Sequence, residues 1–242
     1  MTTRIETKER PILMAGNMVR AILDGRKTET RRVVQPQPPK EISDKIDYWI
    51  DTGFLYGFGK IAKGTDGSQI WPYSPGLSCK SIRNPYGNVG DRLWVRETWA
   101  ASTKAPQIQV AYRADGQCVG CSNDPDWLKV HHGWIHGVAT ETEGRFVGRG
   151  LYGPWKPSIH MPRWASRITL EITDLRIDRL QLITESAAKA EGVKPLLPVA
   201  DQRWRDAFHL LWDSINEKRG YGWDFNPWVW VVQFKRVLSQ VS

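Results

Sequence analysis

The pattern of apolar and polar residues predicts two strands in the last third of the chain. In 167–173 apolar and polar residues alternate, as in a strand with one buried face, and in 227–237 large apolar residues recur at every second position and share one face. A second, short strand over 175–180 is expected after a bend near Asp174. The positions that define the buried faces are Ile168, Leu170, Ile172, Trp228, Trp230, Val232 and Phe234.

Apolar residues spaced three or four apart predict helices. The expected helices cover 18–23, 185–191 and 201–219. Each is followed by a glycine, which is favoured just beyond a helix C-terminus, and these are Gly25, Gly192 and Gly220. Thr184 is a good N-cap for the second helix. The third helix carries the strongest core stripe, formed by Trp204, Phe208, Leu211, Trp212 and Ile215.

The first half of the chain is less regular. Short strands are expected at 12–15 and 93–95, and the second of these leaves a turn at Gly90-Asp91. Two stretches, 35–90 and 103–162, are rich in loops and show no sustained periodicity, and the first is dense in Pro and Gly. We interpret them as insertions in one domain that covers residues 1–242.

Composition is that of a globular protein with a large core. Hydrophobic residues make up 40% of the 242 positions, and 13 of the residues are tryptophan. The net charge of +8 favours anionic partners, RNA among them. No apolar run reaches the ~18 residues that span a bilayer, and the first ten residues carry charges of both signs. We therefore expect no membrane anchor, no secretory signal and a cytoplasmic location.

Four landmarks in a fixed order carry a resemblance to a known family. They are ILDGRKTETRR (22–32), VGDRLWV (89–95), RITLEITDLRIDRLQLITESAAKAEGV (167–193) and WVWVVQFKRV (228–237). The chain resembles the ASCH family of PUA-like β-barrels, and the likeness covers about half of it. The resemblance implies an α+β fold: a partly open, PUA-like β-barrel with flanking helices, interrupted by the two loop-rich insertions.

Within that family the chain is most similar to the small bacterial N(4)-acetylcytidine amidohydrolases. The likeness implies a catalytic Lys-Thr-Glu triad at Lys27, Thr30 and Glu191, with Arg32 as a substrate-binding residue. It implies a small-molecule substrate, an N(4)-acylated cytosine or its nucleoside, and no cofactor. This chain is more than twice as long as those enzymes, so the insertions are expected to alter the pocket.

The implied roles fit the chemistry of amide hydrolysis. A threonine hydroxyl is a weak nucleophile unless a base lies within hydrogen-bond reach. Lys27 serves as that base only if its pKa falls well below the ordinary ~10.4, which burial beside Arg32 favours. Glu191 then orients Lys27 or shuttles a proton. The alternative is that Lys27 and Thr30 lie on a solvated loop and do no chemistry.

Two rival functions remain open. In the first, the chain is an RNA-binding module of the PUA-like class, in which Lys27, Arg31 and Arg32 contact phosphates. In the second, it is an ASCH-type ribonuclease. Thr30→Ala separates the amidohydrolase from the RNA-binding module, because it abolishes an amidase that uses this hydroxyl and barely affects RNA binding.

Further candidates lie outside the triad. Glu97 and Trp99 follow a predicted strand, and Trp99 either stacks on a substrate base or fills the core. His160 and Arg163 lie in a proline-stiffened segment and either face a pocket or serve a structural crossing. Further zinc-ligand candidates are Cys118, Cys121, Cys79, His131, His132 and His136. Cys118 and Cys121 have zinc-ligand spacing, but the other ligands fall at no standard spacing, so we expect no metal.

Overall fold

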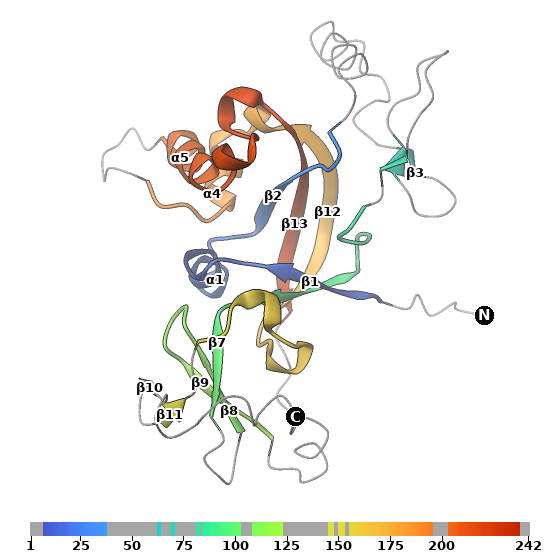
Figure 1. Ribbon diagram of the computed structural model, residues 1–242. Helices are drawn as coiled ribbons and strands as arrows, with labels where there is room; N and C mark the ends of the chain where they lie inside the picture. Colours follow the sequence, from blue (N-terminus) through green and yellow to red (C-terminus); the bar gives the residue numbers. More distant parts are fainter. Residues whose placement is uncertain are drawn as a thin grey trace, which may run out of the picture. The chain divides into compact units, whose positions relative to one another are not determined.

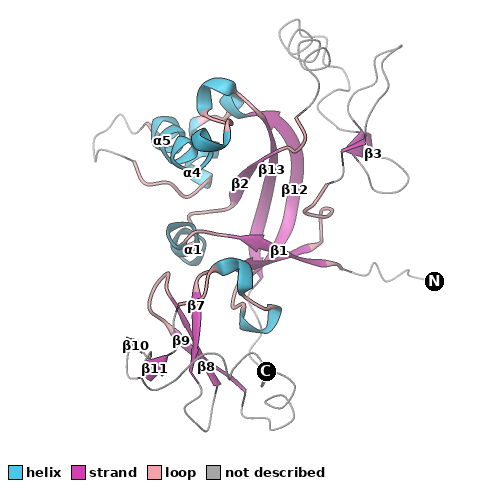
Figure 2. Cartoon of the chain, viewed as in Figure 1, coloured by secondary structure: helices cyan, strands magenta, loops and turns pink. Residues whose placement is uncertain are grey.

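The structure is a computed structural model, shown in Figure 1, that describes ten stretches of the chain. These are residues 7–37, 62–63, 69–70, 81–82, 84–102, 108–122, 145–147, 150–152, 155–195 and 203–237. Helices and strands are both present, as Figure 2 shows, so the predicted α+β class is confirmed. In the described stretches no helix is long and apolar enough to cross a membrane.

The main sheet has five strands in the order β1-β6-β12-β13-β2. Strand β1 runs parallel to β6, whereas β6 pairs antiparallel with β12, and β13 pairs antiparallel with β2. Within the described residues this sheet is not closed into a barrel, and β1 and β2 are its edges. The strands are β1 (Glu9–Leu13), β2 (Glu29–Val33), β6 (Arg92–Arg96), β12 (Thr169–Arg179) and β13 (Trp228–Val237).

Shorter strands form three further sheets. Their orders are β3-β4-β5, β7-β8-β9 and β10-β11. They are β3 (Ala62–Lys63), β4 (Gln69–Ile70), β5 (Ser81–Ile82), β7 (Trp99–Ser102), β8 (Ile108–Tyr112), β9 (Cys118–Ser122), β10 (Arg145–Val147) and β11 (Gly150–Tyr152). All except β7, which precedes the second stretch, fall in the two stretches interpreted as insertions, so those stretches contain strands as well as loops.

Three α-helices complete the described elements. They are α1 (Gly16–Leu23), α4 (Glu185–Ala190) and α5 (Trp204–Asn216). Single 3-10 turns are found at Ser158–His160, Arg163–Ala165, Leu180–Leu182, Glu217–Arg219 and Trp223–Phe225. Gly25, Gly192 and Gly220 all adopt the left-handed conformation with positive φ. The first two follow the ends of α1 and α4 as predicted, whereas α5 ends at Asn216 and Gly220 follows the 3-10 turn at Glu217–Arg219.

The chain divides into two compact units, each assembled from separate stretches of sequence. Unit 1 comprises residues 1–25, 92–171 and 236–242, and unit 2 comprises 26–91 and 172–235. Strand β12 begins in unit 1 and continues in unit 2. The candidate triad lies entirely in unit 2.

In unit 2 the sheet is covered on both faces, which explains why β13 is buried along most of its length. One face carries Val229 and Val231, and it packs against α4 and α5 through Phe208 and Trp212. In Figure 1 both helices lie beside β2 and β13. The opposite face carries Trp228 and Trp230. The odd-numbered residues of β13 therefore face the helices, and the even-numbered residues face away from them.

Unit 1 has its own core beneath the β7-β8-β9 sheet. Trp99, Val110, Tyr112 and Met161 are almost completely buried there. The Tyr112 hydroxyl donates to the backbone carbonyl of Ala165 over 2.9 Å, so the phenol is satisfied inside the core.

Two predicted features of the elements are wrong. Strand β12 is continuous through Asp174, where a bend was expected. The pattern changes phase because even positions such as Ile172 are buried before this point, whereas Leu175 and Ile177 pack into the core after it. On α5, Ile215 is 50% exposed, and Ala207 and Asn216 are buried instead.

Candidate active site

The segment that follows α1 is joined to the end of α4 by consecutive backbone and side-chain contacts. Gly25, with φ of +72°, turns the chain out of α1. Arg26 Nη1 then donates to the Gly192 carbonyl over 2.9 Å, and the Thr28 amide donates to the Ala190 carbonyl over 2.9 Å. Between these two contacts, Lys27 and Glu191 form an isolated β-bridge. Residues 164 positions apart thereby come together.

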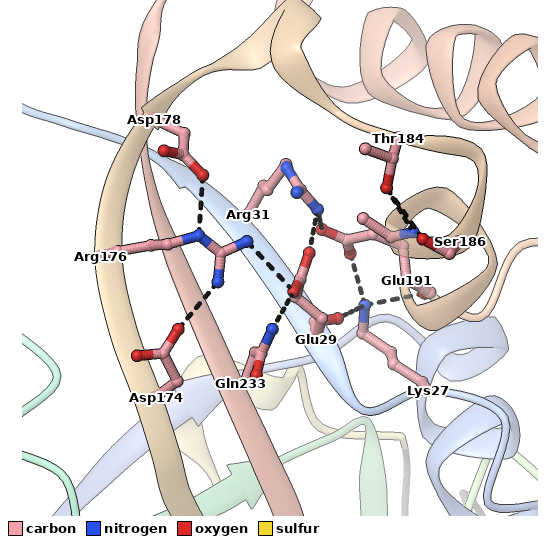
Figure 3. Close-up of polar contacts among 11 residues, drawn as sticks. Lys27, Glu29, Arg31, Asp174, Arg176, Asp178, Thr184, Ser186, Glu191 and Gln233 are labelled. Atoms are coloured by element: carbon pink, nitrogen blue, oxygen red, sulfur yellow. Dashed lines mark hydrogen bonds and ion pairs between the residues drawn. The ribbon is translucent and has the colours of Figure 1, made fainter. Parts of the chain in front are cut away.

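Lys27 is buried and uses all the donors of its amino group. Its Nζ lies 2.7 Å from Glu191 Oε2, 2.8 Å from the Glu191 carbonyl and 2.8 Å from the Glu29 carbonyl. Figure 3 marks these contacts by dashed lines. An ammonium has three N–H donors and no acceptor. Because each donor has an oxygen, this geometry is that of the protonated, positively charged side chain.

The Glu191 carboxylate is shared between two cations. Its second oxygen, Oε1, lies 3.3 Å from Arg31 Nη1. Arg31 also forms an ion pair with the Glu29 carboxylate. The side chains of Lys27, Glu29, Arg31 and Glu191 are all 5% exposed or less, so water does not screen these pairs.

Glu29 connects this buried group to the middle of the sheet. Its Oε2 accepts a hydrogen bond from Gln233 Nε2 over 2.8 Å and lies 3.5 Å from Arg176 Nη2. Arg176 is itself held by Asp174 and Asp178, each at 2.8 Å. Figure 3 shows these contacts as one continuous chain from β12 across β13 to β2 and the end of α4.

The charge of Lys27 is set by opposing influences. Burial lowers its pKa from the ordinary value, because a desolvated ammonium is disfavoured. The adjacent Glu191 carboxylate raises it, and the nearby Arg32 and Arg31 lower it further. The net effect is a lowered pKa, which is the direction that a catalytic base requires.

Lys27, Glu29, Arg31 and Glu191 form a buried charged cluster. Thr30 lies on the opposite face of β2 from this cluster. It is buried and pairs with Val232, whereas Arg31 pairs with Val231. Because side chains alternate along a strand, Thr30 shares its face with Val232, while Arg31 and Glu29 share the face that α4 and α5 cover. The structure thus brings Lys27 and Glu191 together, and the acceptors around Lys27 do not include the Thr30 hydroxyl.

Arg32 also lies on the face of Thr30, away from the buried cluster. It pairs in register with Trp230, a residue of the core on that face. Its guanidinium is close enough to Tyr86 to act on it: burial raises the pKa of the Tyr86 hydroxyl, and Arg32 partly opposes that shift.

The predicted substrate-binding residues Glu97 and Trp99 are part of unit 1. Glu97 is buried and receives two hydrogen bonds from Arg167, at 2.9 and 3.0 Å, which oppose the rise in its pKa caused by burial. Arg167 also binds Asp115 and lies 4.0 Å from the centre of the Tyr112 ring. Trp99 is completely buried in the core, as its core-filling interpretation predicts.

The remaining candidates are also assigned to unit 1. His160 is exposed at the end of a 3-10 turn, and Arg163 forms a partly exposed ion pair with Glu9 at 2.8 Å. Cys118 and Cys121 both lie in strand β9. Cys79, His131, His132 and His136 lie outside the described residues. Among the residues that are described, no group of three His, Cys, Asp or Glu side chains could hold a metal ion.

Sequence reasoning missed Glu29 as a member of this cluster, and it treated Arg31 only as a solvated or phosphate-binding residue. The two share a face of a short edge strand, where charged residues are commonly solvated. The available signal was that both are odd-numbered, as Lys27 is, and therefore share its face of the chain.

No protein-family model, curated protein or solved structure matches this chain.

Proposed function

We propose that the chain is an amidohydrolase that cleaves the amide of N(4)-acylated cytosine, cytidine or a related nucleoside. The observation that carries the proposal is the ion pair of Lys27 and Glu191, buried together at 2.7 Å although 164 residues apart. Unpaired buried charges are costly, and perturbed, buried ionisable groups are enriched at active sites. The proposal includes a PUA-like, ASCH-type fold, a small-molecule substrate, a cytoplasmic location and no cofactor.

In this reaction the amide bond between the acyl carbon and the exocyclic N4 breaks. A hydroxyl adds to the acyl carbon, and N4 leaves with a proton, so that water and the acyl-cytosine yield cytosine and a carboxylic acid while the enzyme is regenerated. Lys27 takes the proton of the nucleophile and returns it to N4, and Glu191 orients Lys27. To act as the base, Lys27 has to release one proton first, which its lowered pKa favours.

The nucleophile is the part of the triad that the geometry supports least. Thr30 faces away from Glu29 and Arg31, so its hydroxyl serves only if this end of β2 rearranges. A water molecule activated by the Lys27–Glu191 pair fulfils the same role without that rearrangement. Thr30→Val, which keeps the shape of the side chain, separates a threonine nucleophile from a water nucleophile.

The test is the ultraviolet spectrum of N(4)-acetylcytidine mixed with the purified protein, since deacylation changes the absorbance. Lys27→Met and Glu191→Gln are expected to lose turnover while circular dichroism shows a retained fold. Lys218→Met, at an exposed lysine, is the matched control and keeps turnover. Wild-type protein that leaves acetyl and larger acyl groups intact contradicts the proposed activity.

An RNA-binding module is the second candidate function, and the net charge of +8 favours it. Lys27 and Arg31 are buried in ion pairs within the protein, so the phosphate contacts expected of them would have to come from other basic residues. RNA affinity that falls steeply with salt, without hydrolysis of acylcytidine, supports this alternative. Cleavage of the RNA in the same assay supports a ribonuclease instead.

A further inference from the structure

Two cations compete for one buried carboxylate in unit 2. Glu191 presents Oε2 to Lys27 at 2.7 Å and Oε1 to Arg31 at 3.3 Å. The shorter contact is with Lys27, although a guanidinium is the better partner for a carboxylate because it can bind both oxygens at once. A feature of the structure must therefore prevent Arg31 from binding both carboxylate oxygens of Glu191.

That feature is Glu29. Its carboxylate forms the second ion pair of Arg31, and it is 2% exposed, so the pair forms without competition from water. Arg31 is further restrained because its guanidinium carbon lies 5.9 Å from the centre of the Phe208 ring on α5. Glu29 is in turn fixed by Gln233 and Arg176.

We propose that Glu29 and Arg31 form a positioning pair, in which Glu29 neutralises Arg31 and thereby leaves the Glu191 carboxylate to Lys27. The pair determines how strongly Lys27 is held as an ammonium at this centre. The assignment of a catalytic consequence to the pair rests on the proposed amidohydrolase function, whereas its effect on Lys27 does not.

The charged groups around Lys27 come from a small number of elements. Strand β2 supplies Glu29, Arg31 and Arg32, the end of α4 supplies Glu191, and β12 supplies Arg176 through Glu29. Gln233, from β13, is neutral. Removing the charge of Glu29 therefore leaves Arg31 with Glu191 as its buried counter-ion, in direct competition with Lys27.

The experiment measures the titration of Lys27 by NMR in protein carrying side-chain-labelled lysine, with the Lys27 signal assigned by its loss in Lys27→Met. In Glu29→Gln, Arg31 shifts toward Glu191, and the pKa of Lys27 falls below its wild-type value. In Arg31→Gln the competing cation is gone, and the pKa of Lys27 rises. In the double variant both charges of the pair are removed, and the pKa returns to the wild-type value or above it.

The return of the Lys27 pKa to its wild-type value in the double variant is the decisive result. If Glu29 and Arg31 only supported the local structure, the two replacements would change the pKa in the same direction and their effects would add. Asp174→Asn is the control, because it also removes one carboxylate charge, but from the partly exposed ion pair of Asp174 with Arg176. It leaves the titration of Lys27 unchanged. A Glu29→Gln protein with an unchanged or raised pKa of Lys27, or a double variant as low as Glu29→Gln, overturns the proposal. If Glu29→Gln does not fold, the rise in Arg31→Gln decides the question alone.

Activity adds a separate reading. If wild-type protein hydrolyses acylcytidine, the acidic limb of the pH–rate profile moves to lower pH in Glu29→Gln and to higher pH in Arg31→Gln, together with the pKa of Lys27. If wild-type protein shows no turnover, the proposed function fails, and the titrations still decide whether Glu29 and Arg31 position Lys27.

Discussion

Replacing Lys27 by methionine is expected to destabilise unit 2 by about 3 kcal/mol. Methionine fills a similar volume but removes three hydrogen bonds of 2.7–2.8 Å from a side chain that is 1% exposed. Breaking a buried ion pair by removing one partner costs about 3–5 kcal/mol. We expect the lower end of that range, because Arg31 remains 3.3 Å from the Glu191 carboxylate that is left behind.

Replacing Glu191, the partner of Lys27, is expected to lower the free energy of unfolding by more than replacing Lys27 does. Glu191→Leu leaves both Lys27 and Arg31 buried without the carboxylate that they share, so the loss is expected at the upper end, about 5 kcal/mol. In the double variant Lys27→Met/Glu191→Leu, the loss should be smaller than the sum of the two, because the residues are coupled.

Urea unfolding followed by circular dichroism measures these differences from the shift of the midpoint at an unchanged slope. Lys218→Met is the control and should stay within about 0.5 kcal/mol of wild type, as for other exposed positions. A loss below about 1 kcal/mol for Lys27→Met, or a larger loss for Lys27→Met than for Glu191→Leu, would refute the reasoning from burial and shared charge.

Three further predictions concern pH, the turn after α1 and the cap of α4. Because burial lowers the pKa of Lys27, the unfolded chain binds more protons than the folded chain between that lowered pKa and 10.5. Wild type should therefore gain stability relative to Lys27→Met as the pH rises through this window. Parallel curves of unfolding free energy against pH for the two proteins would contradict this. Gly25→Ala should cost about 1 kcal/mol in urea unfolding, since φ is +72° there although nothing lies within 4 Å of the added Cβ. Thr184→Ala should cost about 1 kcal/mol and speed amide exchange in α4, because its hydroxyl accepts from the Ala187 amide; unchanged exchange excludes this role for the cap.

Local patterns predicted the strands and helices of unit 2 better than their contacts. The spacing of the large apolar residues placed the even residues of 228–234 on one face of β13, and Trp228 and Trp230 are found together in a core on that face. The odd residues Val229 and Val231 are apolar as well, because the opposite face is also buried. At Asp174 the same reasoning failed. The alternation reports which face is buried, and in β12 the buried face changes while the strand continues.

The candidate site was predictable only in part from the sequence. Nothing in local spacing brings Lys27 to Glu191, and only the family resemblance suggested that they share a site. Glu29 was not predicted, and Arg31 was not predicted as a buried residue, because their burial depends on α4 and α5, which pack on that face of β2 from distant parts of the chain. Thr30 was placed beside Lys27 by the family resemblance, which does not itself say to which face of a strand the residue points.

The discontinuous assembly of unit 2 has a consequence for how the protein is made. Strand β2, which carries Glu29 and Arg31, pairs with β13, which the ribosome synthesises about two hundred residues later. At the usual elongation rate of about 5–20 residues per second, β2 emerges roughly 10–40 s before its partner exists. During that interval its charged side chains are hydrated, so the desolvation of Lys27, Glu29 and Arg31 is a late event. Folding of this unit should therefore wait for the synthesis of β13 and be slow, as expected where contacts join residues about two hundred positions apart.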